Sequence, residues 1–437
     1  MAMVVKNNMS AISTLNTLNK NSSALAKSLQ KVSSGMKING AADDASGYAI
    51  SERMRVQIRG LDQANSNTQN GSSMMKVAEG AVSSTVDILK TLKEKVINAA
   101  NDTNTDSDRQ TIQKELNQSI DQINDNANVT FNGKYLVDGS HNKKIQQTST
   151  TLTNQSLSTT TATNTGLTDL KDRNGNSLNI HSNDNLTVSY VKQGKTYTTT
   201  FQVGTGTTLD TMLKNVTAAS KSNDLKITQA SSVIGKDSSG NTVYTADGTS
   251  AISISSVASG VGNQISGLTI SVTDSDGNIN KSANAVLDNF SESIRAENAG
   301  PDNSLVLQVG TKANQAIKVG LTDMRSEALG LSGSDGSKLN ISTQVKANAA
   351  INVLDNAVQK ALDQQTTIGS IESRLEYTSS NLTTASENVQ AAESTIRDAD
   401  MAKEMTNYTK NNVLLQAAQS MLAQANQSSS SVLSLLQ

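Results

Sequence analysis

Neighbouring carboxylates are the residues of this chain that come closest to a chemical site. Asp43 and Asp44 are adjacent, and Asp398 and Asp400 stand two apart near the other end. Such pairs can act as general acid and base or contribute to a metal site. Aspartates also begin helices, because the carboxylate accepts the free backbone N–H groups of a first turn. We expect Asp43 or Asp44 to cap a helix or contact a subunit, and Asp398 and Asp400 to lie on a solvated or interfacial helix face.

Other residue types that perform catalysis are scarce. The two histidines, His141 and His181, do not lie in the HExxH pattern of zinc proteases. The chain has no cysteine, which excludes disulfides and thiolate metal sites. No GxGxxG or P-loop pattern occurs, and no nucleophile–base pair is visible in the sequence. We therefore expect no enzyme activity, no metal and no cofactor.

The composition favours long helices over a large aromatic core. The 437 residues include 3 Phe, 7 Tyr and no Trp, although aromatic side chains normally supply much of a buried core. With 37 basic and 39 acidic residues the net charge is -2, which argues against nucleic acid as a partner. The single proline, Pro301, leaves long helices almost uninterrupted. No apolar run is long enough for a membrane span or a cleaved signal, so we expect a cytosolic protein or one exported by another route.

Two runs of apolar residues spaced seven apart must form the main scaffold. The first comprises Met54, Leu61, Met75, Val82, Leu89 and Val96, with Thr68 as a polar step; the second comprises Ile368, Leu375, Leu382, Val389 and Ile396. A seven-residue repeat keeps one stripe along one side of a long helix. Neither helix can bury its stripe alone. We expect the two helices to pack against each other within one chain, with the middle of the chain looped out.

Both ends of the chain are predicted to be helices with apolar faces. The sequence offers each of them no packing partner except the other. Their apolar residues include Val5, Met9, Ile12, Leu15 and Leu18 at one end and Leu414, Ala418, Met421, Leu422, Val432, Leu433, Leu435 and Leu436 at the other. The steps of three and four residues in 3–32 are typical of an amphipathic helix. A membrane surface could cover such stripes, but few basic residues accompany them, so partner helices fit better.

Between the ends, the pattern changes several times. Helices are expected from Asp43 or Asp44 to about 100, over 107–127, and from about 342 to 396; Asn132-Gly133 predicts a hairpin over 129–136, and another is expected over 305–319. The composition of the Ser/Thr-rich stretch 148–166 is equally consistent with a flexible linker and with a segment that carries O-linked sugars. Alternating runs at 186–190, 197–201 and 268–272 predict strands, with short helices at 208–219 and 283–294. The predicted fold is mainly α, a long antiparallel coiled-coil-like rod formed by both chain ends with an inserted α+β outer domain.

Several longer segments resemble bacterial flagellins. SSGMKINGAADDASGYAISERM (33–54) is similar to the signature near the N-terminus of that family. STIRDADMAKEM (394–405) and SMLAQANQSSSSVLSLLQ (420–437) are similar to the C-terminal one, and LQVGTKANQAIKVGLTDM (307–324) to the strand region before the last rod helix. The resemblance covers about 1–139 and 303–437, whereas 140–300 falls where flagellins vary.

The resemblance implies a subunit that polymerises into the bacterial flagellar filament for motility. Residues 1–40 and 400–437 would form the inner tube, 41–139 and 301–399 a helical outer tube with β-hairpins, and 140–300 a variable domain on the surface. Assembly would couple folding of the terminal helices to their burial against neighbouring copies. The alternative is a flagellin-like adaptor at the hook–filament junction, and an enzyme on a flagellin scaffold is a distant third.

The resemblance also implies partners. They are the chain itself, hook-associated junction and cap proteins, and an export chaperone, for a protein secreted into the flagellum without a cleaved signal peptide. The vertebrate flagellin-sensing Toll-like receptor contacts the family at positions matching Thr91, Lys95 and Glu115. Flagellins that activate it carry Arg at the first position and Leu at the second, so we expect weakened engagement here. Neither nucleic acid nor membrane is expected as a partner.

Overall fold

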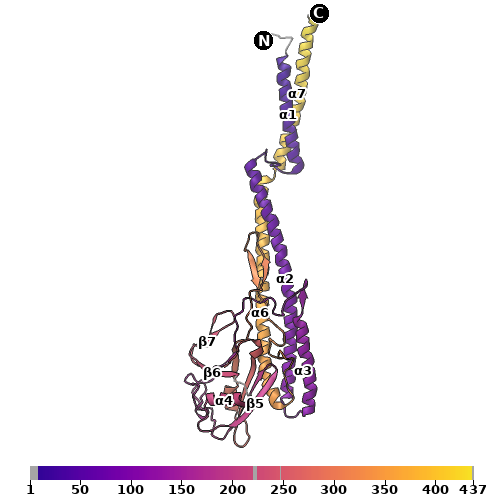
Figure 1. The fold of residues 1–437 in the computed structure, drawn as a ribbon. Coiled ribbons are helices and arrows are strands. Elements are labelled where there is room, and N and C mark those ends of the chain that lie inside the picture. The colour runs from indigo at the N-terminus through magenta and orange to yellow at the C-terminus, as the bar shows by residue number, and fades with distance from the viewer. Residues whose placement is uncertain (1–7, 220–223, 247, 436–437) are drawn as a thin grey trace. The chain divides into compact units, whose positions relative to one another are not determined.

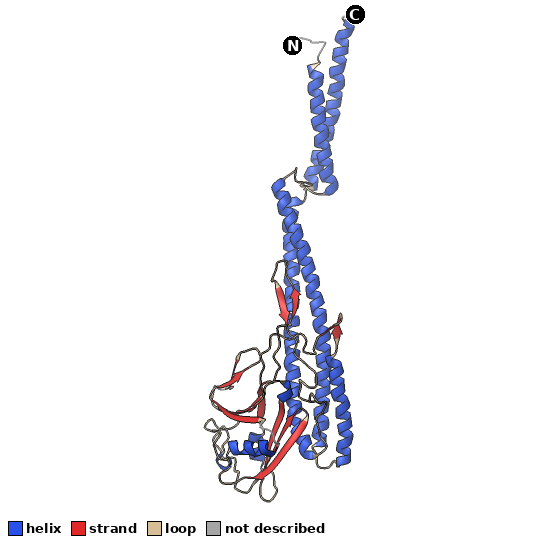
Figure 2. Ribbon diagram, in the orientation of Figure 1, coloured by secondary structure: helices blue, strands red, loops and turns tan. Residues whose placement is uncertain are grey.

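The computed structural model describes residues 8–219, 224–246 and 248–435 (Figure 1). The fold is mainly α, with long helices at both ends of the chain and small β-sheets in the middle (Figure 2). By its internal contacts the chain divides into two compact units. The first holds the residues up to 68, 308–315 and those from 377 onward; the second holds 69–307 and 316–376.

In the first unit, the two terminal helices α1 (Met9–Ser34) and α7 (Met401–Leu435) lie side by side and antiparallel. Asn8 Nδ2 donates to the Ala425 carbonyl at 3.1 Å, and Asn21 Nδ2 donates to the Leu414 carbonyl at 3.1 Å. α1 ends at Gly35, whose φ of 71° is the left-handed conformation that glycine adopts readily.

The first unit also contains the start of α2 (Ala45–Ala99) and the end of α6 (Gln344–Arg397), which pair in antiparallel register. Asn65 Oδ1 accepts from Ser379 Oγ at 2.7 Å, and Asp62 Oδ1 accepts from Ser386 Oγ at 3.0 Å. Leu61 forms a small hydrophobic cluster with Ala64 and Leu382, in which Ala385 and Val389 take part.

In the second unit, α2 is accompanied by α6 on one side and by α3 (Asp106–Ala127) on another (Figure 2). Lys93 forms an ion pair with Asp355 of α6, and Asn126 of α3 donates to Ser84 Oγ of α2 at 3.2 Å. α3 begins with a capping box in which the Thr105 and Asp108 side chains each bond the other's backbone N–H.

Two short hairpins accompany the helices. β1 (Thr130–Phe131) and β2 (Lys134–Tyr135) are joined by Asn132-Gly133, both with positive φ, as the sequence predicts. β12 (Leu305–Gln308) and β13 (Ala316–Val319) form a further two-stranded sheet.

The inserted domain is built on two antiparallel sheets in the second unit. The first has the order β10-β4-β5, and the second has the order β11-β3-β9-β6. Their bounds are Thr151–Asn154 for β3, Asn185–Lys192 for β4, Lys195–Gln202 for β5, Leu225–Ala230 for β6, Ala251–Ser256 for β9, Ile265–Thr273 for β10 and Phe290–Ile294 for β11. β7 (Val233–Lys236) pairs with β8 (Thr242–Tyr244).

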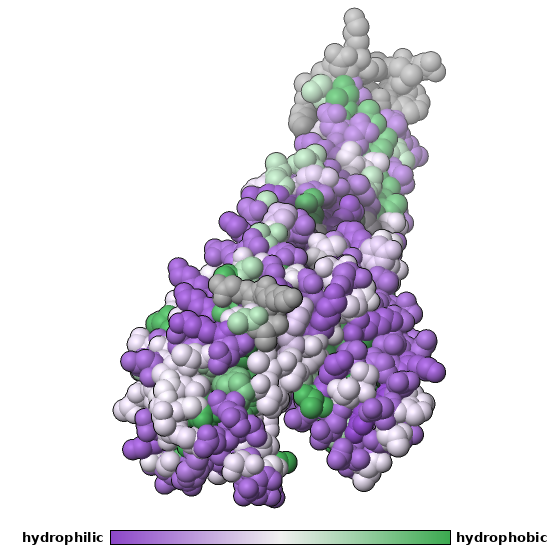
Figure 3. All heavy atoms as spheres, turned by 60° about the horizontal axis from the view of Figure 1, so that its bottom comes forward, coloured by the Kyte–Doolittle hydropathy of each residue, from purple (hydrophilic) through white to green (hydrophobic). Residues whose placement is uncertain are grey.

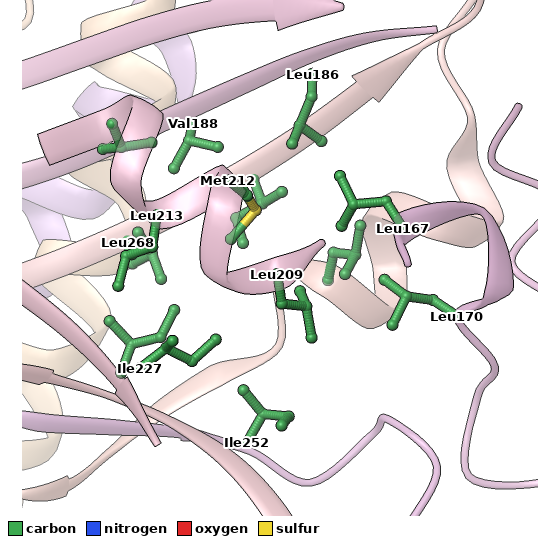
Figure 4. Packing of buried hydrophobic residues seen from close by; sticks show 14 of the residues in the cluster. Leu167, Leu170, Leu186, Val188, Leu209, Met212, Leu213, Ile227, Ile252 and Leu268 are labelled. Atoms are coloured by element: carbon green, nitrogen blue, oxygen red, sulfur yellow. The ribbon is translucent and has the colours of Figure 1, made fainter. Parts of the chain in front are cut away.

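One hydrophobic core joins these sheets to α4 (Leu209–Ala219). Met212 and Leu213 of the helix, Leu186 and Val188 of β4 and Ile252 of β9 belong to one buried cluster. Figure 4 shows the side chains of α4 beside those of the strands and of the 167–170 segment. The inserted domain therefore has a core of its own, made mainly of aliphatic residues between positions 152 and 287 and including the buried Tyr190.

Two expectations for the middle of the chain are wrong. The stretch 148–166 is not a flexible linker throughout, because its residues Thr151–Asn154 form β3, an inner strand that is buried along its length. The helix expected over 283–294 ends early: α5 spans Lys281–Leu287, and β11 follows from Phe290. Both differences arise because β3 pairs with β9 on one side and with β11 on the other. This pairing makes 151–154 a strand and makes the residues from Phe290 a strand in place of the end of a helix.

Candidate assembly surface

The surface of the α1–α7 pair carries large apolar side chains that remain exposed. Met9 is 69% exposed and Met421 58%, and the same pair of helices also exposes Ile12, Leu15, Leu29, Val413 and Leu414. Figure 3 shows hydrophobic side chains in green along the helical part of the chain, where hydrophilic residues surround them. Several large apolar side chains exposed on one pair of helices are typical of an interaction site.

The buried seam between the two helices is made of small side chains. Ala418 of α7 is buried, and so is Ser28 of α1, whose hydroxyl accepts from Asn411 Nδ2 at 3.1 Å. Leu18 and Leu422 are half-buried. Val5 and Leu436 lie outside the described residues, and the side chains of Val432, Leu433 and Leu435 are outside them as well.

The heptad residues occupy different environments in the two units. In the second unit Met75, Val82, Leu89, Val96, Ile368 and Leu375 are fully buried. In the first unit Leu61 and Leu382 are buried, whereas Met54, Val389 and Ile396 are half-buried. The polar step Thr68 is buried too, and its hydroxyl donates to the Ala64 carbonyl of the same helix at 2.8 Å.

Arg397, at the end of α6, is a buried charge that the sequence analysis did not single out. Its Nη1 donates to Glu52 Oε1 at 2.6 Å, its Nε lies 3.2 Å from Met36 Sδ, and its guanidinium stands 5.5 Å from the centre of the Tyr48 ring. The Arg397 hydrogen bond holds the pKa of Glu52 below its ordinary value.

The neighbouring carboxylates serve as helix caps and turn acceptors. Asp44 Oδ1 accepts from the backbone N–H groups of Ser46 and Gly47, both at 3.0 Å, at the start of α2. Asp43 accepts from the Asn39 N–H, and Asp400 caps α7 through the Ala402 N–H at 3.0 Å. Asp398 accepts from Ser394 Oγ at 2.6 Å.

The two histidines lie in separate environments. His141 Nδ1 is 3.3 Å from the Asn303 carbonyl oxygen, and His181 is exposed in the turn before β4. Within the described ranges, no three His, Asp or Glu side chains are grouped so that they could hold a metal ion. Within the same ranges, no helix combines the length and the apolar character that crossing a membrane requires.

The three receptor-related positions lie on the adjoining helices α2 and α3. Thr91 is exposed, and its hydroxyl donates to the Asp87 carbonyl of its own helix at 3.0 Å. Lys95 forms an ion pair with Glu115 at 3.1 Å. Glu115 is therefore already engaged by a cation of its own chain.

A group of buried charges lies where the inserted domain meets α6. Lys360 of α6 and Glu292 of β11 are each 6% exposed at the side chain, with Lys360 Nζ 3.5 Å from Glu292 Oε1. Burial lowers the pKa of Lys360 and raises that of the nearby Glu297. A cavity of about 240 Å³ beside them is lined by Arg295, Glu297, Lys360 and Arg325, among others.

Taken together, these features define a helical structural subunit whose exposed terminal helices offer surfaces for association. Family models agree with this class at both ends of the chain. The bacterial flagellin N-terminal helical region matches residues 5–142, and the bacterial flagellin C-terminal helical region matches residues 351–436.

Relatives match over nearly the whole chain. A flagellin from Clostridium tyrobutyricum is 34% identical over 97% of this chain and 99% of its own length. A flagellin from Bacillus subtilis is 30% identical over 99% of this chain and 100% of its own length. Among solved structures, a flagellar hook associated protein-3 from Legionella pneumophila has a TM-score of 0.33 and 16% identity, covering 78% of this chain and 97% of that chain.

The chain belongs to the bacterial flagellin family. It is a structural subunit of the flagellar filament, an extracellular polymer of many copies of one chain. The family is one of structural proteins.

Proposed function

We propose that this flagellin polymerises by burying the exposed apolar stripes of α1 and α7 against neighbouring copies. The observation that carries the proposal is the exposure of large side chains from Met9 to Leu29 and from Val413 to Met421. Removing such surface from water is favourable by about 25 cal/mol per Å² of apolar area. A contact that repeats head to tail without closing a ring extends into an open helical array.

In this proposal the segments take different places in the filament. Residues 1–40 and 400–437 form the inner tube, 41–139 and 301–399 the outer tube, and 140–300 a domain facing solvent. The separate core of the inserted domain supports this division, because that domain needs no neighbour to bury its aliphatic residues. The α1–α7 pair, in contrast, leaves its largest apolar side chains exposed.

A seeded polymerisation assay tests the proposal. Purified monomer added to short filament fragments is expected to elongate into long fibres, whereas a hook–filament junction adaptor would add a limited number of copies. Removing residues 401–437 is expected to leave a soluble, helical monomer that does not elongate seeds. A truncated chain that still polymerises would contradict the role given to α7.

Point variants sharpen the same test. Met9→Gln combined with Met421→Gln is expected to raise the critical concentration at least about tenfold, since burying one such side chain contributes on the order of 1.5–3 kcal/mol. Val257→Gln is the matched control, because Val257 is 54% exposed on the inserted domain. Equal critical concentrations for the two variants would count against an apolar inner-tube contact.

Export of the chain forms a further part of the proposal. We infer secretion without a cleaved signal peptide, with a dedicated chaperone covering α7 before assembly. The exposed Val413, Leu414 and Met421 supply the apolar face that such a chaperone would shield. The mass of the secreted chain should equal that of the whole sequence, and a mass lacking an N-terminal segment would refute this route.

We also propose that the vertebrate flagellin-sensing receptor is engaged weakly. The Lys95–Glu115 ion pair supports this, because it occupies the carboxylate and places a cation where activating flagellins carry Leu. Lys95→Leu together with Thr91→Arg is expected to raise potency in a reporter-cell titration. Full potency of the unaltered chain beside a strong activator would contradict the proposal.

A further inference from the structure

The three-stranded sheet of the inserted domain has two edges with different surroundings. Its strand order is β10-β4-β5, so β10 forms one edge and β5 the other. At the β10 edge, side chains bond the outer backbone groups. The Ile270 N–H donates to Asp288 Oδ1 at 3.3 Å, and the Val272 N–H donates to Asn284 Oδ1 at 2.7 Å. Among the described residues, no side chain and no further strand bonds the outer edge of β5 in this way.

The geometry of the β4–β5 hairpin determines which backbone groups of β5 point outward. Gln193-Gly194 joins the strands with positive φ at both residues, and Lys192 pairs with Lys195 beside this turn. The residues that flank a two-residue turn form a hydrogen-bonded pair, and bonded and non-bonded pairs alternate beyond it. The N–H and C=O groups that point away from β4 therefore belong to every second residue of β5, namely Thr196, Thr198, Thr200 and Gln202.

β5 also lacks the features that protect the edges of the neighbouring sheet. Charges, prolines and bulges ordinarily keep an edge strand from pairing with another chain. Edge strand β6 carries the exposed Lys226, and edge strand β11 carries Glu292 and an irregular register. β5 pairs regularly with β4 along its whole length and has neither charge nor proline after Lys195, whose Nζ pairs with Asp335 at 2.6 Å. Its outer edge is therefore suited to pairing with a further strand.

We propose that β5 pairs in antiparallel orientation with β5 of a second copy, which joins two inserted domains through one continuous sheet. The charge of the strand supports this occupant and this orientation. Parallel pairing in register would place Lys195 opposite Lys195 of the second copy, and like charges directly opposite are destabilising. Antiparallel pairing keeps the two lysines at opposite ends of the contact.

One antiparallel register pairs every residue whose backbone groups point outward. It centres on Thr199, which lies opposite Thr199 of the second copy. The same register places Tyr197 opposite Phe201, and both side chains are only partly buried against the core of their own domain. Aromatic side chains directly opposite each other stabilise a sheet. The pairs between the two copies are Thr196–Gln202, Tyr197–Phe201, Thr198–Thr200 and Thr199–Thr199.

This contact differs in kind from the one proposed for α1 and α7, and it goes beyond that function. It is isologous, because the same strand of each copy takes part, so it closes after two copies. The inserted domain has its own core, so the pairing does not require the terminal helices. One strand from each copy buries little surface, and we therefore expect a weak dimer.

Disulfide cross-linking of the full chain tests the proposal, since the chain has no cysteine of its own. Directly opposite residues of antiparallel strands are close enough for a disulfide. Under mild oxidation below the critical concentration, Thr199→Cys should form covalent dimers at least about tenfold faster than Gln202→Cys. Gln202→Cys is the matched control, because this register holds the two Gln202 positions far apart. Rates are corrected for the reactivity of each thiol toward a small reagent.

A second measurement follows the dimer without cross-linking. Thr198→Lys adds a charge to the exposed edge, and its dimer dissociation constant in sedimentation should be at least about tenfold that of the original chain. Thr242→Lys is the matched control, at an exposed position of β8, and should change the constant less than twofold. Protection of the β10 amides from exchange shows whether both variants keep the domain folded.

The outcomes separate this pairing from assembly through the terminal helices. The preference for Thr199→Cys should persist when Met9→Gln and Met421→Gln are added; loss of the preference there would assign the contact to the filament and overturn independent pairing. Thr199→Cys that cross-links no faster than Gln202→Cys would also overturn the proposal. So would a dimer that Thr198→Lys leaves unchanged, because another surface would then join the copies.

Discussion

Asp288 should make the stability of the inserted domain depend on pH, and Asp288→Asn should remove that dependence. The carboxylate follows α5 and accepts from the Ile270 N–H of β10 at 3.3 Å and from Asn352 Nδ2 of α6 at 3.1 Å. Burial raises the pKa of Asp288 to about 6, against an ordinary value of 3.8. An amide of the same shape keeps an oxygen to accept these bonds but carries no charge.

The sign and the size of the effect follow from these two values. The folded state binds the proton more tightly than the unfolded state, so the domain is more stable at low pH and loses stability as pH rises from about 4 through 6. The difference of pKa corresponds to at most about 3 kcal/mol of unfolding free energy above pH 7, at about 1.4 kcal/mol per unit.

Hydrogen exchange of the β10 amides is the appropriate assay, because a chain with two compact units need not unfold in one step. The protection of these amides in the original chain should fall between pH 5 and pH 7.5 after correction for intrinsic exchange, and Asp288→Asn should abolish most of that fall. Asp276→Asn, at an exposed position in the turn after β10, is the control. An Asp288→Asn chain with the same pH profile as the original would refute the reasoning.

Three further substitutions test the packing. Leu89→Ala, at a fully buried heptad position, should cost about 2–5 kcal/mol of unfolding free energy in urea, whereas Ile97→Ala, at a position that is 51% exposed, should cost far less. Thr105→Ala should lower the stability of α3 by about 1 kcal/mol through loss of its capping box, measurable as faster amide exchange in its first turn. Lys360→Met should cost about 3 kcal/mol, because it leaves the buried Glu292 with only the more distant Arg295, whose Nε lies 3.9 Å from Oε2, and adding Glu292→Gln should recover part of the loss in thermal unfolding.

Features encoded by local pattern could be predicted from the sequence. The seven-residue spacing indicated two long helices, and the structure has α2 and α6 with bounds within a few residues of those expected. Asn132-Gly133 predicted a hairpin because both residues tolerate positive φ. The pattern Asp-x-x-Gly-Asn at 172–176, 237–241 and 274–278 could have predicted three more turns, since in each the Asp side chain accepts from the Asn backbone and side chain.

Features created by contacts between distant residues could not be predicted in the same way. The Thr-rich run around β3 has the polar composition of a linker. Threonine also favours β-strands, but this preference takes effect only through pairing with β9 and β11, which are distant in sequence. Arg397 meets Glu52 across 345 positions of sequence, and no local pattern predicts this ion pair. The pKa of Asp288 likewise depends on the folded structure, because burial raises it and the hydrogen bond from Asn352 of α6 opposes that rise.

The contrast between the inserted domain and the terminal helices explains why one chain can be both a folded monomer and a polymer subunit. The inserted domain encloses its aliphatic side chains between two sheets and α4, so its stability does not depend on neighbours. The α1–α7 pair buries mainly Ala418 and Ser28 among its described side chains and leaves Met9, Val413 and Met421 in water. Helices of this kind gain most of their stability from packing, not from intrinsic propensity. In the proposed assembly, burial of these side chains against neighbouring copies supplies that packing, which couples the ordering of α1 and α7 to polymerisation.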